Sequence, residues 1–233
     1  MKKLFEKHET LSCILLIVLY ILINSFCLNN FGTTDYRSAL INTLLSFFLL
    51  TLTIILNKTK YYGLNKVTNL KKYLYFFPLI LIVLVNFLNG ISINNTKTEI
   101  IFYMLNMINI GFIEEIIFRG FLFKMMAKDN IKSAIIVTSI TFGIGHIINL
   151  LHGAELTSTI LQIISAISVG YLFAIIFYKS NSIIPCIITH SLINSLSIFS
   201  NSNSTTLYIE SLILIILPLI YAFYINKHIK EGE

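Results

Sequence analysis

Long apolar blocks, separated by short polar stretches, limit what this chain can fold into more than any other feature. A block of about 18 or more apolar residues is long enough to cross the hydrocarbon layer of a bilayer as a helix. Only 12% of the 233 residues are charged, whereas an ordinary soluble domain carries about 25%. We therefore predict an all-α, polytopic membrane protein, a bundle of about eight transmembrane helices forming a single membrane domain over 1–233. The predicted spans are 11–28, 38–56, 73–89, 100–123, 133–150, 158–178, 183–200 and 207–225.

Basic residues alternate between the predicted loops. Of the 17 lysines and arginines, all but Arg37, Lys97 and Arg119 fall in the two termini and in every second loop. Loops rich in Lys and Arg stay on the cytoplasmic side of a membrane. We therefore predict a multi-pass protein of the cell membrane with cytoplasmic N- and C-termini. The net charge of +6 then reflects orientation in the lipid bilayer, and we expect no nucleic-acid partner.

A few ionisable and polar side chains interrupt the apolar blocks and mark the candidate site. A charged side chain at the centre of a membrane helix costs about 2.5–3.5 kcal/mol on insertion scales. Such residues usually face the interior of the bundle, have partners and serve a function. The fourth block carries Glu114, Glu115 and Arg119, the fifth carries His146, and the seventh carries His190 and Asn194.

The spacing of these residues assigns some of them to one helix face. Glu115 precedes Arg119 by four positions, the favourable order for an ion pair on one face, and we interpret this pair as structural. Glu114 is rotated by about 100° from Glu115 and has no partner on its own helix, so we expect it to be unpaired. His190 and Asn194 are also four apart and project from one face.

Depth in the membrane supports one shared site. At about 1.5 Å per residue, Glu114 lies roughly 14 Å, His146 roughly 20 Å, His190 roughly 11 Å and Asn194 roughly 17 Å from the cytoplasmic ends of their helices. All four positions fall in the middle third of the bilayer. Residues on independent helices need not agree in depth, so their agreement favours a common site.

Two kinds of chemistry fit these residues, and both lead to peptide hydrolysis. A carboxylate in a low-dielectric pocket can act as a general base toward water, while a His and an Asn donate hydrogen bonds to the resulting oxyanion. Alternatively, Glu114, His146 and His190 are a legitimate zinc set that leaves one position for water, although no H-E-x-x-H spacing is present. No Ser–His–Asp set is evident.

Several neighbouring residues have plainer interpretations. Phe142 lies one turn before His146, and we interpret it as a packing residue unless it braces that imidazole. Gly143, Gly145 and Gly170 are expected to let helices approach closely.

Three motifs in this order, "EEIIFR" (114–119), "FGIGH" (142–146) and "HSLIN" (190–194), resemble those of the CPBP family. This is the family of CAAX-processing and bacteriocin-processing intramembrane proteases, also called Abi, and the resemblance covers its catalytic core within 114–194. The resemblance implies an eight-helix bundle that encloses an intramembrane cavity open to the cytosol and to lipid.

The resemblance also implies a role for each site residue. Glu114 is similar to the water-activating base of the family, which works with a histidine like His146. His190 and Asn194 resemble its oxyanion hole. Glu115 supports the site together with Arg119. The family is often labelled a metalloprotease, while a metal-free glutamate mechanism is also proposed for it, so zinc stays an open question.

These observations predict an intramembrane endopeptidase that hydrolyses a peptide bond of a membrane-associated or lipidated peptide or protein. Relatives in the family trim prenylated CAAX proteins, process peptide pheromones, or act in bacteriocin export and self-immunity. The alternative is a non-cleaving membrane protein, for binding or immunity, that sequesters a bacteriocin or partner peptide. A transporter with a proton relay ranks last, since no inverted repeat is evident.

Overall fold

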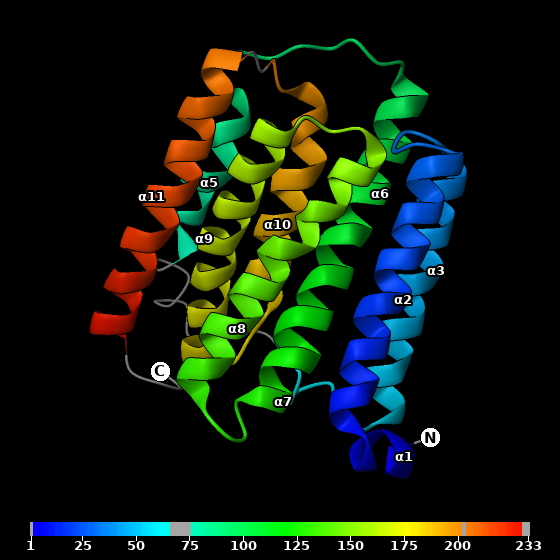
Figure 1. Ribbon diagram of the computed structural model, residues 1–233, viewed down its shortest axis with the longest axis vertical. Coiled ribbons are helices and arrows are strands. Elements are labelled where there is room, and N and C mark those ends of the chain that lie inside the picture. The colour runs from blue at the N-terminus through cyan, green and yellow to red at the C-terminus, as the bar shows by residue number, and fades with distance from the viewer. Residues whose placement is uncertain (1, 66–75, 202–203, 230–233) are drawn as a thin grey trace.

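The computed structural model of the chain describes residues 2–65, 76–201 and 204–229. Over these residues the chain is helical and contains no strand, only one isolated bridge between Ile91 and Ser200. The all-α prediction is confirmed. Figure 1 shows the long helices running side by side in one bundle.

The longer helices begin and end where the sequence supplies the right residues. The described helices are α1 (Lys2–Lys7), α2 (Glu9–Asn30), α3 (Tyr36–Ile55), α5 (Leu79–Leu84), η1 (Val85–Phe87), α6 (Lys97–Glu115), η2 (Ile116–Phe123), α7 (Lys124–Met126), α8 (Ile131–Ile144), η3 (Gly145–His152), α9 (Leu156–Ser180), α10 (Ile184–Leu196), η4 (Ser197–Phe199) and α11 (Ser204–His228). Thr96 and Glu99 form a capping box at the start of α6, which satisfies two free N–H groups. The Asn130 side chain caps α8, and Asn181 ends α9 with a left-handed φ of 54°, as C-terminal caps do.

Within the described residues, six helices are long and apolar enough to cross a membrane, rather than the eight that we predicted. These helices are Glu9–Asn30, Tyr36–Ile55, Lys97–Met126, Ile131–His152, Leu156–Ser180 and Thr206–His228. The predicted seventh span forms a shorter apolar helix, Ile184–Phe199.

The predicted third span, 73–89, is not a continuous helix where the structure describes it. Its first residues, 73–75, lie outside the described residues. The rest begins a short helix after Pro78, tightens into a 3₁₀ turn at η1 and ends before Gly90, whose φ is +86°. The Asn86 amide donates to the Ile193 carbonyl at 2.8 Å, which ties this segment to α10.

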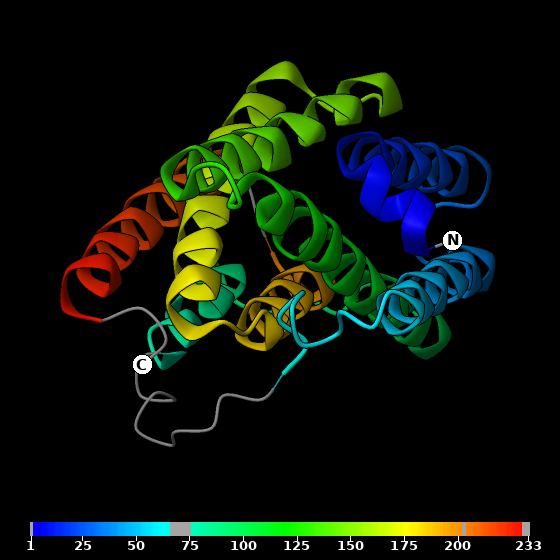
Figure 2. The ribbon, with the colours of Figure 1, turned by 90° about the horizontal axis from the view of Figure 1, so that it is seen from below.

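The bundle is held together by apolar packing and by a few buried polar pairs. Helix α9 packs against α8 and α11, and α6 packs against α3 and α10. Asn42 of α3 donates to Asn106 of α6 at 2.8 Å, and Asn109 of α6 donates to Thr43 of α3 at 2.9 Å. Within a bilayer the hydrophobic effect does not drive helices together, because lipid is as apolar as their side chains. Interhelical hydrogen bonds such as these therefore help to hold the helices together. Figures 1 and 2 place α2 and α3 at one edge of the bundle and α11 at the other.

Large apolar side chains cover the outside of the bundle. Leu22 of α2, Phe47 of α3 and Phe223 of α11 are 63%, 62% and 71% exposed. A water-soluble protein rarely leaves contiguous apolar surface of this extent uncovered. The chain is therefore a multi-pass membrane protein, whose apolar exterior faces lipid.

The start of α1 and the end of α11 lie at the same end of the bundle (Figure 1). Ion pairs hold the N-terminal helices at this end: Lys58 lies 3.0 Å from Glu6, and Lys128 pairs with Glu9. The hydrogen bond from Lys58 lowers the pKa of Glu6, and the hydrogen bond to Glu9 raises the pKa of Lys128. Termini at one end fit an even number of crossings, as the alternation of basic loops predicts.

Candidate active site

The conversion of α6 into a π-helix marks the centre of the site. Glu114 and Glu115 are the last residues of α6, and η2 continues the same helix with the wider π geometry. All residues of η2 are buried. Short π segments inside α-helices occur frequently at functional sites.

Glu115 is the residue on which the buried charges converge. Nη1 of Arg119 donates to its Oε1 at 3.0 Å, and both side chains are 0% exposed. The ion pair predicted from their spacing is confirmed. Nδ1 of His190 lies 2.9 Å from the same oxygen. Because an ionised carboxylate only accepts hydrogen bonds, Nδ1 of His190 carries a proton and donates a hydrogen bond to Glu115. Nε2, on the opposite side of the ring, then faces Glu114.

Glu114 is also paired, which corrects our expectation. Its side chain is almost buried; Oε2 lies 3.3 Å from Nε2 of His190, and Oε1 accepts a hydrogen bond from the Tyr20 hydroxyl at 2.5 Å. The prediction of an unpaired Glu114 was wrong because it considered partners on the same helix only. Both partners come from other helices, α2 and α10.

Tyr20 is a site residue that sequence reasoning missed. It lies in the middle of a predicted span, 11–28, whereas interfacial tyrosines gather at the ends of spans. That position was a signal, because a buried phenol needs a hydrogen-bond partner. Nothing in the sequence names Glu114 as that partner, 94 positions away.

Phe142 packs against three of the polar site residues. Its ring lies 4.3 Å from Cζ of Arg119, and the ring centroids of His146 and His190 lie 5.5 Å and 5.6 Å from its own, both edge-on. Edge-to-face contacts of this kind fix the ring orientation. Phe142 is therefore both a packing residue and a brace for the two imidazoles.

Two of the three glycines expected at close helix contacts are found there. A Cβ at Gly170 would lie 2.9 Å from Nη2 of Arg119 and 3.1 Å from Cδ1 of Phe142, and a Cβ at Gly143 would lie 2.8 Å from a backbone oxygen of α9. Gly145 has open space where its Cβ would be, so its expected role was wrong. Gly170 makes room for the buried guanidinium.

His146 and Asn194 lie beside this cluster with fewer contacts. His146 is half-buried at the junction of α8 and η3, and its Nδ1 lies 3.3 Å from the Phe142 carbonyl. No hydrogen bond joins it to Glu114 or His190 among the described contacts. The Asn194 side chain, half-buried on α10, makes no hydrogen bond within the described part of the chain.

The structure thus brings Glu114, Glu115, Arg119 and His190 into one connected set, and it places His146 against that set through Phe142. Comparison with protein-family models gives one match to this region. Residues 95–196 match the family "Type II CAAX prenyl endopeptidase Rce1-like". This segment, less than half of the chain, is similar to the Rce1-like family. The resemblance to the CPBP proteases is confirmed.

The Rce1-like segment covers α6 to α10 and contains all three motifs. The match supports a protease, and together with the apolar helices it supports a CAAX-type intramembrane protease in general, with a membrane-associated substrate. Tyr20 lies outside the Rce1-like segment. Comparison with curated proteins and comparison with solved structures gave no match.

A zinc site does not fit the candidate active-site residues in this arrangement. No three His, Cys, Asp or Glu side chains are grouped so as to hold a metal ion in the described ranges. Both nitrogens of His190 face carboxylate oxygens, those of Glu114 and Glu115, so neither is free for a metal. The alternative set of Glu114, His146 and His190 is not assembled.

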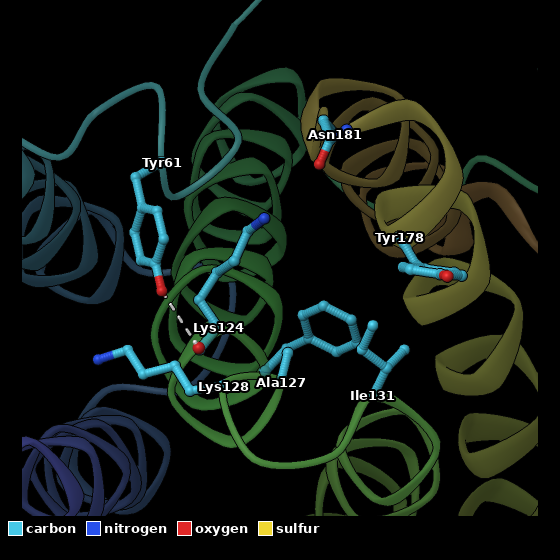
Figure 3. Close-up of a pocket in the computed structure, with 8 residues that line it drawn as sticks. Tyr61, Lys124, Ala127, Lys128, Ile131, Tyr178 and Asn181 are labelled. Atoms are coloured by element: carbon cyan, nitrogen blue, oxygen red, sulfur yellow. Dashed lines mark hydrogen bonds between the residues drawn. The ribbon is translucent and has the colours of Figure 1, made fainter. Parts of the chain in front are cut away.

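A pocket of about 290 Å³ lies away from this site, at the end of the bundle that carries α7. Figure 3 shows Tyr61 and Lys124 on one of its walls, joined by a hydrogen bond from the Tyr61 hydroxyl to the Lys124 carbonyl at 3.3 Å. Its lining residues are Tyr61, Phe123, Lys124, Ala127, Lys128, Ile131, Tyr178 and Asn181. None of these is one of the candidate active-site residues, so this pocket does not confirm the predicted intramembrane cavity.

Proposed function

We propose that this protein is an intramembrane endopeptidase that hydrolyses a peptide bond of a membrane-associated or lipidated peptide or protein. The observation that carries the proposal is the placement of the Glu114 carboxylate. It is almost buried within the candidate membrane span Lys97–Met126, beside the imidazole of His190, and it is held by side chains from two other helices. A carboxylate fixed next to a hydrogen-bond donor is the arrangement that water-mediated hydrolysis needs.

In this proposal Glu114 is the general base. Its carboxylate takes a proton from a water molecule while the water oxygen forms a bond to the carbonyl carbon of the substrate. The electron pair of the C=O double bond moves to the carbonyl oxygen, which becomes the oxyanion. When the C–N bond breaks, the carbonyl re-forms and Glu114 gives its proton to the departing amine.

His190 and Asn194 are proposed to stabilise the oxyanion. Nδ1 of His190 is bound to Glu115, so Nε2 is the nitrogen that faces the reacting groups, and it donates to the oxyanion in the imidazolium form, which carries a proton on both nitrogens. The Asn194 amide lies one helical turn further along α10, on the same face. It makes no hydrogen bond among the described residues, so donating one to substrate breaks none of those contacts.

Glu115, Arg119 and His146 complete the proposed machinery. Glu115 orients His190, and Arg119 compensates the buried charge of Glu115. His146 is proposed to assist Glu114, because it packs on the same Phe142 ring as His190, the partner of Glu114. Because the site residues do not fit zinc as they stand, we derive no step through a metal. The basic end of the bundle is proposed to face the cytoplasm of a cell membrane.

A comparison of the membrane peptides in cells with the wild-type protein and in cells with Glu114→Gln tests this function. The same comparison identifies the substrate. We expect cells with the wild-type protein to contain cleavage products that disappear with Glu114→Gln. The matched control is Glu210→Gln, because Glu210 is a partly buried glutamate of α11, outside the active-site contacts. Products that persist with Glu114→Gln would refute the proposal. Protection against a bacteriocin that survives both Glu114→Ala and His146→Ala would favour the non-cleaving alternative.

A further inference from the structure

Helix α2 contributes one side chain to the active site. The Tyr20 hydroxyl donates to Oε1 of Glu114 at 2.5 Å, and the Tyr20 side chain is 6% exposed. Tyr20 lies outside the Rce1-like segment, 95–196. The contact therefore joins the N-terminal part of the chain to the residue that we propose as the base.

The two oxygens of Glu114 are held by different partners. Oε1 accepts from Tyr20, and Oε2 lies 3.3 Å from Nε2 of His190. The terminal torsion of a glutamate has broad, shallow minima, so a carboxylate held through one oxygen only would still turn. With both oxygens engaged, a rotation of the group breaks at least one contact. Tyr20 thus prevents the rotation of the Glu114 carboxylate that the contact with His190 alone would still allow.

Helix α2 is anchored at both ends around Tyr20. At one end Glu9 pairs with Lys128. At the other end Nδ1 of His152 lies 2.8 Å from Oδ1 of Asn29. A side chain in the middle of a helix fixed at both ends is a rigid support for a neighbouring group.

We infer that Tyr20 is a positioning residue of the active site, whose hydroxyl holds the Glu114 carboxylate in the orientation that takes a proton from water. The inference rests on the proposed function, because Tyr20 acts through Glu114. A displacement of about 1 Å in a reacting group costs about 100-fold in rate. Loss of the hydroxyl is therefore expected to lower kcat and to leave substrate binding unchanged.

The experiment measures kcat, KM and the unfolding temperature of the purified full-length protein in liposomes. The probe is the membrane peptide whose cleavage distinguishes wild type from Glu114→Gln. Tyr20→Phe is expected to lower kcat about 10- to 100-fold, with KM within about twofold of wild type. Tyr20→Met, which fills the space with a flexible apolar side chain, is expected to lose as much.

Tyr103→Phe is the matched control. The Tyr103 hydroxyl on α6 lies 2.7 Å from Oγ of Ser197 and makes no contact with Glu114 among the described hydrogen bonds. This variant also removes a phenolic hydrogen bond within the bundle, but it is expected to keep both kcat and KM. The Tyr20→Phe and Tyr103→Phe variants are expected to unfold at similar temperatures.

Each other outcome overturns the inference in a different way. A higher KM with normal kcat in Tyr20→Phe would mean that Tyr20 contacts substrate. A kcat loss that tracks a lowered unfolding temperature would make Tyr20 merely structural. If the wild-type protein is active and Tyr20→Phe is equally active, only the role of Tyr20 is overturned. If the wild-type protein cleaves nothing, the proposed function is overturned and this inference falls with it.

Discussion

The Nδ1 atom of His190 lies 2.9 Å from Oε1 of Glu115, although the two residues are 75 positions apart. The same oxygen accepts a hydrogen bond from Arg119. One buried carboxylate therefore both neutralises an arginine and orients the imidazole that faces Glu114. Loss of the Glu115 carboxylate is therefore expected to lower both the stability and the activity of the protein.

Glu115→Gln is expected to destabilise the protein by about 3–5 kcal/mol, since it leaves the fully buried Arg119 without its counter-ion. Cleavage is expected to fall as well, because His190 loses its charged acceptor. Unfolding in detergent and the cleavage rate are the measurements. The double variant Glu115→Gln/Arg119→Met is expected to regain much of the stability but not the activity. A single variant as stable as wild type would show that the ion pair is not needed.

Phe142→Leu is expected to lower activity about tenfold or more, because the ring braces His146, His190 and Arg119 and small displacements of reacting groups are costly. Phe123→Leu is the matched control: Phe123 is also buried and packs against Phe177, in contact with none of the site residues among its described ring contacts. Both variants are expected to lose up to about 3 kcal/mol of stability. Equal activity of the two variants would argue against a bracing role.

Gly170→Ala is expected to lower both stability and activity, because its Cβ would lie 2.9 Å from Nη2 of Arg119. Overpacking of this kind typically costs about 1–3 kcal/mol. Gly145→Ala adds the same methyl group where space is open and the backbone is helical, so it is expected to be neutral or slightly stabilising. Thermal unfolding of the two variants side by side gives the comparison. A Gly170→Ala variant with wild-type stability and activity would show that the Arg119 guanidinium can move aside to accommodate the added methyl group.

The parts of the fold that could be predicted from sequence were those set by local rules. Apolar length located most of the helices, because the bilayer dictates the length of a span. The four-residue spacing of Glu115 and Arg119 predicted their ion pair, since both groups lie on one helix. The motifs predicted that Glu114 and His190 belong to one site.

The parts that could not be predicted depend on contacts between distant segments. Tyr20 reaches Glu114 across 94 positions, and no spacing rule covers such a pair. The third predicted span, 73–89, is apolar enough to cross a membrane. In its described part, however, α5 begins only after Pro78 and passes into the 3₁₀ turn η1, where Asn86 binds the Ile193 carbonyl of α10. The π-helix after Glu115 has no sequence pattern that we could use.

Removal of metal ions is expected to leave cleavage unchanged, because both nitrogens of His190 are occupied by carboxylate oxygens. The measurement is elemental analysis of the purified, active protein together with its cleavage rate after dialysis against a chelator. We expect far less than one zinc per chain and full activity. Activity that is lost on dialysis and restored by zinc would mean that His190 turns away from Glu114 or Glu115 in the working enzyme.

The rate of peptide cleavage by Glu114→Gln in liposomes tests the central claim most directly. Glutamine keeps the size and the hydrogen-bonding ability of the side chain but cannot take a proton from water. A general base contributes about 10²- to 10⁴-fold to such a reaction, so we expect a loss of that size, with Glu210→Gln cleaving at the wild-type rate. A Glu114→Gln protein that cleaves as fast as wild type would contradict the assignment of Glu114 as the base.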